Sequence, residues 1–373
     1  MLQNGQAIHQ QLPMIDARID HLSTSNKDLL QHTQRIGQNV QVLTDNADTW
    51  TSALQGIQTQ IALMHDANER LSSNRRLLDQ LQNPLHFTMP SYQGGVFATD
   101  TVFLPEDNGV WTFADINGDG FLDLVYIKTS NTGTGKIEVH GAPNEGRFQE
   151  HTLQTGTAFP VGDQGTWLMQ DWTGDGKADL IYIKTRNTGT KMTEIHVCTA
   201  ASGYQSFALQ TGTCFQCEQD EHEDDGVWTV SRKGDLVWIK TRNCDSDKIE
   251  YHVASRASNY QQFTRHSPTD FEVEDDGTWC IAPARSGDFE DLYYIKTRNT
   301  GSGKVEVHAV SASSRWKSRL VDVVTSFEPD HNGRWLMAEF SHGGGPDLVY
   351  TKTGGCASGK VEVHVVGQRR SLV

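Results

Sequence analysis

The stretch IKTRNTGSGKVEVH, residues 295–308, recurs along this chain of 373 residues and thereby decides its fold. Its last residue, a histidine, returns every 56 residues, and the glutamate two positions before it and the lysine twelve positions before it keep the same step. The copies are His140, His196, His252, His308 and His364; Glu138, Glu194, Glu250, Glu306 and Glu362; and Lys128, Lys184, Lys240, Lys296 and Lys352. Such a period indicates one supersecondary unit repeated five times from about residue 91 onward.

Each repeat contains four strand-like runs. In the second copy they cover residues 166–170, 180–185, 193–198 and 204–210, and each is short, rich in β-branched or aromatic residues and bounded by Gly, Asn, Asp or Ser. Four antiparallel strands per repeat, arranged radially, form the blade of a β-propeller. We name these strands a to d.

The two ends of the repeat region are complementary. The last copy stops after a strand c over residues 360–366, whereas residues 92–99 and the following VFLPEDNGVW match the strand d and the next loop around residues 204–228. We therefore predict an all-β five-bladed β-propeller over residues 91–373, with an N-terminal strand that completes the last blade and leaves no open edge.

The recurring Glu and His lie on one face of strand c. Glu306 and His308 project to the same side and Val305 and Val307 to the other. Because blades stack face to face, we predict that this polar face presses against a neighbouring blade, where Glu, His and the recurring Lys satisfy one another. A part in ligand binding and a pH-sensitive blade contact are the alternatives.

The turns indicate which loops share a face. In an antiparallel meander, the b–c turn (RNTG) and the d–a connection (acidic-Gly-x-Trp) lie on the same side of the ring. The candidate ligand-binding residues on this face are Arg186, Asn187, Arg242, Asn243, Arg298, Asn299, Asp225, Asp276, Trp111, Trp167, Trp228, Trp279 and Trp335. For the tryptophans, packing between blades is the alternative role.

The a–b connection of the first repeat has the pattern of a calcium loop. Its oxygen-bearing side chains stand at positions 1, 3, 5 and 9, with a glycine for the sharp turn, and can surround a hard cation. The predicted ligands are Asp115, Asn117, Asp119, the carbonyl near Phe121, and Asp123. An ordinary Asp/Asn/Gly turn is the alternative.

The second repeat keeps this loop with Thr at position 3, so it should bind calcium more weakly. Its predicted ligands are Asp171, Thr173, Asp175 and Asp179. The other three copies keep only the last aspartate in common (Asp235, Asp291, Asp347), which we expect to cap strand b whether or not a cation is bound. Calcium is therefore predicted as a structural ion at one or two sites.

These loops resemble those of the FG-GAP or VCBS repeat family, which carry a DxNxDGxxDL motif between propeller strands, as in integrin α subunits and fungal propeller lectins. DGKADLIYIKTRNTGT (175–190), VEVH (305–308) and SNYQQF (258–263) are similar to VCBS-type repeats, although the literal FG-GAP tetrapeptide is absent. The resemblance implies sugar binding in shallow pockets between blades, where an aromatic ring meets the apolar side of the sugar and Asp, Asn or Arg bind its hydroxyls.

Residues 1–90 have a different composition, rich in Gln, Asn and Leu. With Leu12 at heptad position a, every d position from Ile15 to Leu78 is apolar, which predicts an α-helical coiled-coil stalk and a homo-oligomer. Ile at a and d favours a trimer and Asn at a favours a dimer, and we expect the trimer. A helical hairpin or bundle is the alternative.

Composition excludes several classes. The formal net charge of −15 argues against a nucleic-acid partner. No stretch predicts a membrane span or signal peptide, so a cytoplasmic protein, or one released by a non-classical route, is expected. The cysteines do not follow the repeat, and we expect Cys214 and Cys217 to be unconnected thiols rather than a disulfide or half of a zinc site with His222.

The sequence therefore predicts a multivalent lectin that binds glycans or glycoproteins. A protein-binding or adhesion head on a structural fibre, or a lectin-like toxin component, is the alternative. We expect no enzymatic activity, because the candidate groups are spread equally around a ring and no GxSxG, HExxH or phosphate loop is present.

Overall fold

Short strands bounded by Gly, Asn, Asp or Ser form the repeat region of the computed structural model. The structure describes residues 20–34, 90–92, 97–162, 165–217, 225–284, 289–340, 345–367 and 369–370. The chain divides into two units, Met1–Thr88 with Leu372–Val373 and Met89–Ser371, and each is described by itself.

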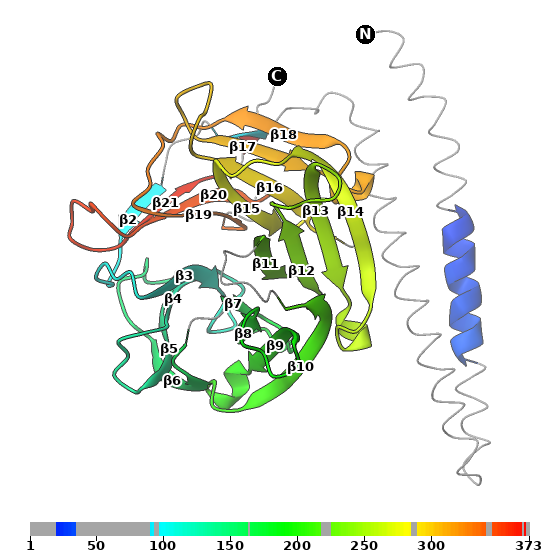
Figure 1. Cartoon of the computed structure of the whole chain (residues 1–373), viewed down its shortest axis with the longest axis horizontal. Coiled ribbons are helices and arrows are strands. Elements are labelled where there is room, and N and C mark those ends of the chain that lie inside the picture. Colours follow the sequence, from blue (N-terminus) through cyan, green and yellow to red (C-terminus); the bar gives the residue numbers. More distant parts are fainter. Residues whose placement is uncertain are drawn as a thin grey trace. The chain divides into compact units, whose positions relative to one another are not determined.

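The second unit contains five four-stranded antiparallel sheets, which Figure 1 shows as blades around a common centre. Blade 1 is β3 (Gly109–Ala114), β4 (Asp123–Lys128), β5 (Lys136–Ala142) and β6 (Leu153–Pro160). Blade 2 is β7 (Gly165–Gln170), β8 (Asp179–Lys184), β9 (Met192–Cys198) and β10 (Phe207–Gln216). Blade 3 is β11 (Gly226–Val230), β12 (Leu236–Lys240), β13 (Lys248–Ala254) and β14 (Phe263–Glu272). Blade 4 is β15 (Gly277–Ala282), β16 (Asp291–Lys296), β17 (Glu306–Val310) and β18 (Arg319–Val324). Blade 5 is β19 (Gly333–Ala338), β20 (Asp347–Lys352), β21 (Glu362–Val366) and β2 (Phe97–Asp100).

Blade 5 confirms the predicted closure of the ring. The N-terminal strand β2 pairs antiparallel with β21, with Phe97 opposite Val365 and Asp100 opposite Glu362. A second pairing, between β1 (Pro90–Ser91) and β22 (Arg369–Arg370), also joins the two ends of the unit. With β2 paired to β21, the sheet of blade 5 has four strands, like the sheets of the other blades.

Apolar side chains from neighbouring blades form the core. Each tryptophan on strand a meets a phenylalanine from the end of the preceding strand d; for example, the Phe271 and Trp279 rings lie 4.9 Å apart, edge to face. One cluster joins Trp111 of blade 1 to Val363 of blade 5, so the last interface is packed like the others. Short 3-10 turns (Ala200–Ser202, Arg256–Ser258, Ala312–Ser314) connect strands c and d in blades 2 to 4.

The aspartate that begins strand b has the structural role predicted for it. Asp123 is fully buried and accepts hydrogen bonds from the backbone N–H groups of Ile116, in the a–b loop, and Asn144, after strand c, at 3.1 and 2.9 Å. Asp291 likewise accepts from Ala312 at 2.8 Å. The residue therefore ties the a–b loop to the segment after strand c in blade 1, and it binds the segment after strand c in blade 4, which lacks the complete motif.

In the first unit the structure describes one short helix, over residues 20–34. The predicted coiled-coil stalk is not shown, because its other heptad positions, like those of the alternative hairpin, lie outside the described residues. His222 also lies outside them, whereas Cys214 and Cys217 are described and form no disulfide with each other. Among the described helices, none is long and apolar enough to cross a membrane.

Candidate functional site

A row of side chains crosses one face of each blade, because the central residues of the strands are in register. In blade 4, Trp279 lies opposite Tyr294, Tyr294 opposite His308, and His308 opposite Asp322. The Trp279 and Tyr294 rings stack with centroids 4.2 Å apart. The row therefore changes from apolar on the inner strands to polar on the outer ones.

The recurring Glu and His pair in every blade. The distance between a glutamate oxygen and the His Nε2 atom is 3.2 Å in blades 1, 2, 3 and 5 and 3.5 Å in blade 4. The prediction that these two residues satisfy one another is thus confirmed.

The recurring Lys has a different partner from the one predicted. Lys296 Nζ lies 3.1 Å from a carboxylate oxygen of Glu274 in the d–a loop, and Lys352 Nζ lies 3.1 Å from Asp330 at the equivalent position. The lysine therefore joins strand b to the loop that enters its blade, because that loop carries an acid within its reach.

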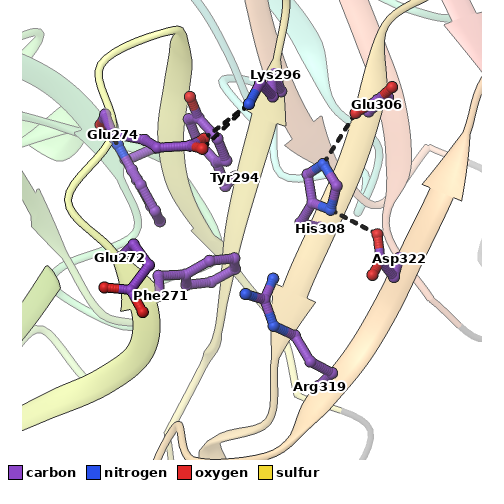
Figure 2. Close-up of a pocket in the computed structure, with 10 residues that line it drawn as sticks. Phe271, Glu272, Glu274, Tyr294, Lys296, Glu306, His308, Arg319 and Asp322 are labelled. Carbon is purple, nitrogen blue, oxygen red and sulfur yellow. Dashed lines mark hydrogen bonds and ion pairs between the residues drawn. The ribbon is translucent and has the colours of Figure 1, made fainter. Parts of the chain in front are cut away.

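Blade 4 contains a pocket of about 300 Å³ on this face, closed on one side by the end of β14 of blade 3. We call it the blade 4 pocket. Figure 2 shows Lys296 directed toward Glu274, His308 between Glu306 and Asp322, and Arg319 beside the ring of Phe271. Its lining residues are Phe271, Glu272, Glu274, Trp279, Tyr294, Lys296, Glu306, His308, Arg319 and Asp322.

His308 joins two carboxylates of this pocket. Its Nδ1 atom lies 2.7 Å from Asp322, and its Nε2 atom lies 3.5 Å from Glu306 (Figure 2). Glu306 also accepts hydrogen bonds from the hydroxyl and the backbone N–H of Ser302, at 2.7 and 3.2 Å. Burial would raise the pKa of Glu306, but these hydrogen bonds and His308 outweigh it and lower the pKa, so the carboxylate stays ionised and oriented.

Arg319 forms another wall of the pocket. Its guanidinium lies over the Phe271 ring, 4.3 Å from the centroid, and Nε donates to Asp270 at 2.9 Å. Both partners belong to blade 3, so this arginine spans the boundary between two blades. The contact with Phe271 holds the guanidinium over the aromatic ring. The hydrogen bond to Asp270 uses only Nε, so the other N–H groups of Arg319 take no part in it.

The predicted tryptophans lie in the core. Trp111, Trp167, Trp228, Trp279 and Trp335 are only 2 to 5% exposed. Each stacks on the aromatic residue of strand b beside it, with ring centroids 4.0 to 5.3 Å apart. Trp279 alone of these lines the pocket described above, and the tryptophans otherwise occupy the packing positions considered as their alternative role.

The predicted turn residues lie together on one face, beside the d–a loops. The backbone N–H groups of Thr297 and Arg298 donate to the Asp276 carbonyl, and the Asn299 side chain donates to the Asp276 carboxylate at 2.8 Å. Asn243 and Asp225 make the same contact in blade 3. Asn187, Asn243 and Asn299 adopt φ of 50°, a left-handed conformation that Asn tolerates well. These asparagines and aspartates build the turn, and Arg298 remains exposed beside it.

The remaining turn arginines are less open than Arg298. Arg186 and Arg242 are half-buried on the same face. None of the predicted turn residues lines the blade 4 pocket. Whether they bind a ligand stays a prediction.

The two predicted calcium loops have the same conformation. Asp115 accepts hydrogen bonds from the N–H groups of Gly118 and Gly120 at 2.6 and 2.8 Å, and Asp171 accepts from Gly174 and Gly176 at 2.7 and 3.0 Å. All four glycines have φ between 81 and 89°, where a side chain would be strained.

The oxygen-bearing side chains of the first loop suit calcium chemically, and those of Asp115 and Asp119 accept hydrogen bonds from backbone N–H groups. Asp119 accepts from the N–H of Phe121, whose side chain is exposed, and from the Asn117 amide. Within the described residues, no three His, Cys, Asp or Glu side chains are grouped to hold a metal ion. Because each carboxylate has further lone pairs beside those that accept these hydrogen bonds, the contacts are compatible with cation binding, and calcium stays a prediction.

Several residues of the pocket were not predicted, notably Glu274, Arg319 and Asp322. The signal for Asp322 was present, since the other copies hold Gln154, Gln210 and His266 at the same position of strand d. A comparison of how the copies differ, rather than of what they share, would have found it.

Comparisons with known proteins agree with the fold. The FG-GAP-like repeat family matches residues 115–182. No curated protein sequence matches the chain. Similar solved structures include an endo-arabinase from Bacteroides thetaiotaomicron (11% identity, 72% of this chain and 96% of that chain covered, TM-score 0.41). Others are an α-L-arabinofuranosidase from Podospora anserina in complex with cellotriose (8%, 76% and 99%, 0.44) and an exo-β-1,3-galactanase from Clostridium thermocellum (8%, 71% and 61%, 0.38).

These neighbours correct one expectation. We expected no enzymatic activity, but the three similar structures named above are an endo-arabinase, an arabinofuranosidase and a galactanase, so that expectation is withdrawn. At these identities and TM-scores the likeness transfers no reaction, substrate or residue to this chain. The repeat match at residues 115–182 and the ring of five four-stranded blades support a β-propeller repeat protein that contains an FG-GAP-like repeat.

Proposed function

We propose that this protein is a lectin, which binds carbohydrate in the blade 4 pocket. The observation that carries the proposal is the composition of that pocket: aromatic rings lie beside fixed carboxylates and cations in a volume of about 300 Å³. This volume is at the lower end of the range for small-molecule sites, as a monosaccharide unit requires.

A sugar ring needs an apolar surface for its C–H groups and fixed partners for its hydroxyls. The rings of Phe271 and Tyr294 line the pocket but are only 4 and 2% exposed, so they contribute a small apolar surface, whereas the carboxylates of Glu306 and Asp322 can accept hydrogen bonds from hydroxyls. Arg319 supplies donors that are already oriented by Asp270 and Phe271. Little side-chain entropy is then lost on binding, which favours affinity.

Oligomerisation would strengthen weak single-site binding. A homo-oligomer through residues 1–90, a trimer rather than a dimer, is part of this proposal, since linked sites can gain ~10² or more in avidity without new contacts. Size-exclusion chromatography with light scattering on the full chain measures the number of copies.

A structural calcium ion in one or two a–b loops is also part of the proposal. Asp115, Asn117, Asp119, Asp123 and the carbonyl near Phe121 would hold the first ion, and the loop of Asp171 the second. Such an ion would neutralise carboxylates whose ionised form is disfavoured by burial and by mutual repulsion. These two effects raise the pKa of Asp123 to about 6.

The test is a glycan array with the full chain, followed by inhibition with free sugar. We expect binding to a defined set of glycans that the matching free sugar abolishes. Because carboxylates line the pocket, release of reducing sugar is measured in the same samples. A folded chain that binds no glycan would refute the lectin function and leave a protein-binding or adhesion head as the explanation of the fold.

A further inference from the structure

The five blades do not carry equivalent sites. We infer that the blade 4 pocket is the principal sugar site, that Arg319 and Asp322 determine its specificity, and that it selects neutral or amine-bearing sugars over acidic sugars. This inference rests on the proposed carbohydrate binding and names the substrate class of that site.

The first difference lies opposite the recurring histidine, on strand d. In blade 4 this position is Asp322, which contacts His308 at 2.7 Å. In blade 2 it is Gln210, whose amide lies 3.4 Å from His196 Nδ1, and in blade 5 it is Ala98. Blade 4 therefore has a carboxylate where the others have a neutral amide, a second histidine or a methyl group.

The second difference lies at the start of strand d. In blades 2 and 3 this position is Phe207 or Phe263, and each ring packs edge to face on the phenylalanine of the preceding blade, at 4.8 and 4.9 Å. In blade 4 it is Arg319, which lies over Phe271 and donates to Asp270. An aromatic wall is thus replaced by a cation.

The partner of that cation is also specific to this boundary. At the position of Asp270, the preceding boundaries have Cys214 and Ala158, neither of which can form an ion pair with an arginine. Asp270, Arg319 and Asp322 thus depart together from the repeat pattern. Arg319 and Asp322 line the pocket and Asp270 binds Arg319 at its edge, so the three departures convert a packing position into a polar site.

The charge of the pocket indicates what it accepts. Four carboxylates (Glu272, Glu274, Glu306, Asp322) line it against two permanent cations, Lys296 and Arg319. Both cations are already in ion pairs, with Glu274 and Asp270. A sugar carboxylate would therefore meet a lining with more carboxylates than cations, and the N–H groups of Arg319 outside its bond to Asp270 offset that repulsion only in part, whereas a hydroxyl or an ammonium group meets acceptors.

The experiment titrates the full chain by calorimetry with two matched sets of sugars: glucose, glucosamine and glucuronic acid, and galactose, galactosamine and galacturonic acid. Within each set the ring is shared and one group differs in charge. We expect one high-affinity equivalent per chain and at least tenfold weaker binding of the acidic member. Binding of the acidic sugar as tightly as the neutral one would overturn the selectivity.

Variants in which one blade receives the residues of another test which blade binds the sugar. Arg319→Phe with Asp322→Gln makes blade 4 resemble blade 2 and should reduce affinity at least tenfold with an unchanged melting temperature. The matched control, Phe263→Leu with His266→Gln in blade 3, should bind like the wild type. The reciprocal triple variant, Phe207→Arg and Gln210→Asp in blade 2 with Ala158→Asp at its boundary with blade 1, should add a second equivalent in blade 2.

The outcomes separate this inference from the function on which it rests. Five equal sites per chain, of which the blade 4 variant removes one, would overturn the inference and retain the lectin. Absence of binding to every sugar and to the glycan array would overturn both.

Discussion

Acidification should destabilise the protein through His252 of blade 3. The side chain of His252 is only 6% exposed, and its ring lies 4.4 Å from the ring of His266. Burial is the larger cause and the charge of His266 the next, and together they lower the pKa of His252 to about 4, although Glu250 at 3.2 Å opposes them. We therefore compare the wild type with His252→Gln at pH 7.5 and pH 4.5.

The sign and size follow from proton linkage. Below pH 6.5 the unfolded histidine binds a proton, whereas the folded one does not until the pH approaches 4. The stability associated with the neutral ring is thus present above pH 6.5 and is lost as the pH falls toward 4. Since a tenfold change in proton affinity is worth about 1.4 kcal/mol, the loss reaches about 2.5 kcal/mol at pH 4.5.

Urea denaturation measures the free energy of unfolding of both proteins at both pH values. All other titrating groups are common to the two proteins, so the difference between variant and wild type should move by about 2.5 kcal/mol in favour of the variant at pH 4.5. The control is His196→Gln in blade 2, where burial also lowers the pKa of the histidine but the side chain is 17% exposed and faces Gln210 instead of a second histidine, so the change should be smaller. A difference for His252→Gln that is the same at both pH values would refute the reasoning.

Three further predictions concern stability. Burial raises the pKa of Glu290. A carboxylate with a raised pKa destabilises the folded state increasingly as the pH rises above the pKa of the unfolded chain. Glu290→Gln should therefore raise the melting temperature at pH 7.5, and this gain should shrink toward pH 4.5. A lower melting temperature at pH 7.5 would contradict this. Calcium at about 100 times its Kd should stabilise the folded chain by about 2.7 kcal/mol, and Asp119→Asn should reduce the effect; equal melting curves with calcium and with chelator would exclude the site. Trp335→Ala should cost about 3–5 kcal/mol in urea denaturation, because the indole is 4% exposed, whereas the exposed Arg298→Ala should stay within about 0.5 kcal/mol; equal losses would mean that the two positions are misassigned.

Much of the fold could be predicted because short-range sequence patterns determine it. The period of 56 residues, the alternation within each strand and the turn residues define the blades without reference to tertiary contacts. The missing fourth strand of the last copy and its match near residue 97 are visible in the sequence alone. The pairing of Glu306 with His308 also follows, since residues two apart in a strand share a face.

The site could be predicted only in part, because it depends on contacts across blade boundaries. The turn residues and tryptophans recur in the repeats and were therefore predicted to bind the ligand, but Trp279 stacks on Tyr294 inside the blade. Lys296 pairs with Glu274, 22 positions away, instead of with the glutamate of its own hairpin. Arg319 reaches Asp270, 49 positions away, in another blade.

The sequence by itself determined the number of blades, their strands, the closure of the ring and the loops that share a face, because each follows from a repeat compared with its copies. Only the tertiary structure decided which face of a blade is hollow and which side chains meet there. The physical reason is that the offset between two packed blades selects Asp270 and Phe271 as the partners of Arg319, and no spacing within one repeat encodes that offset.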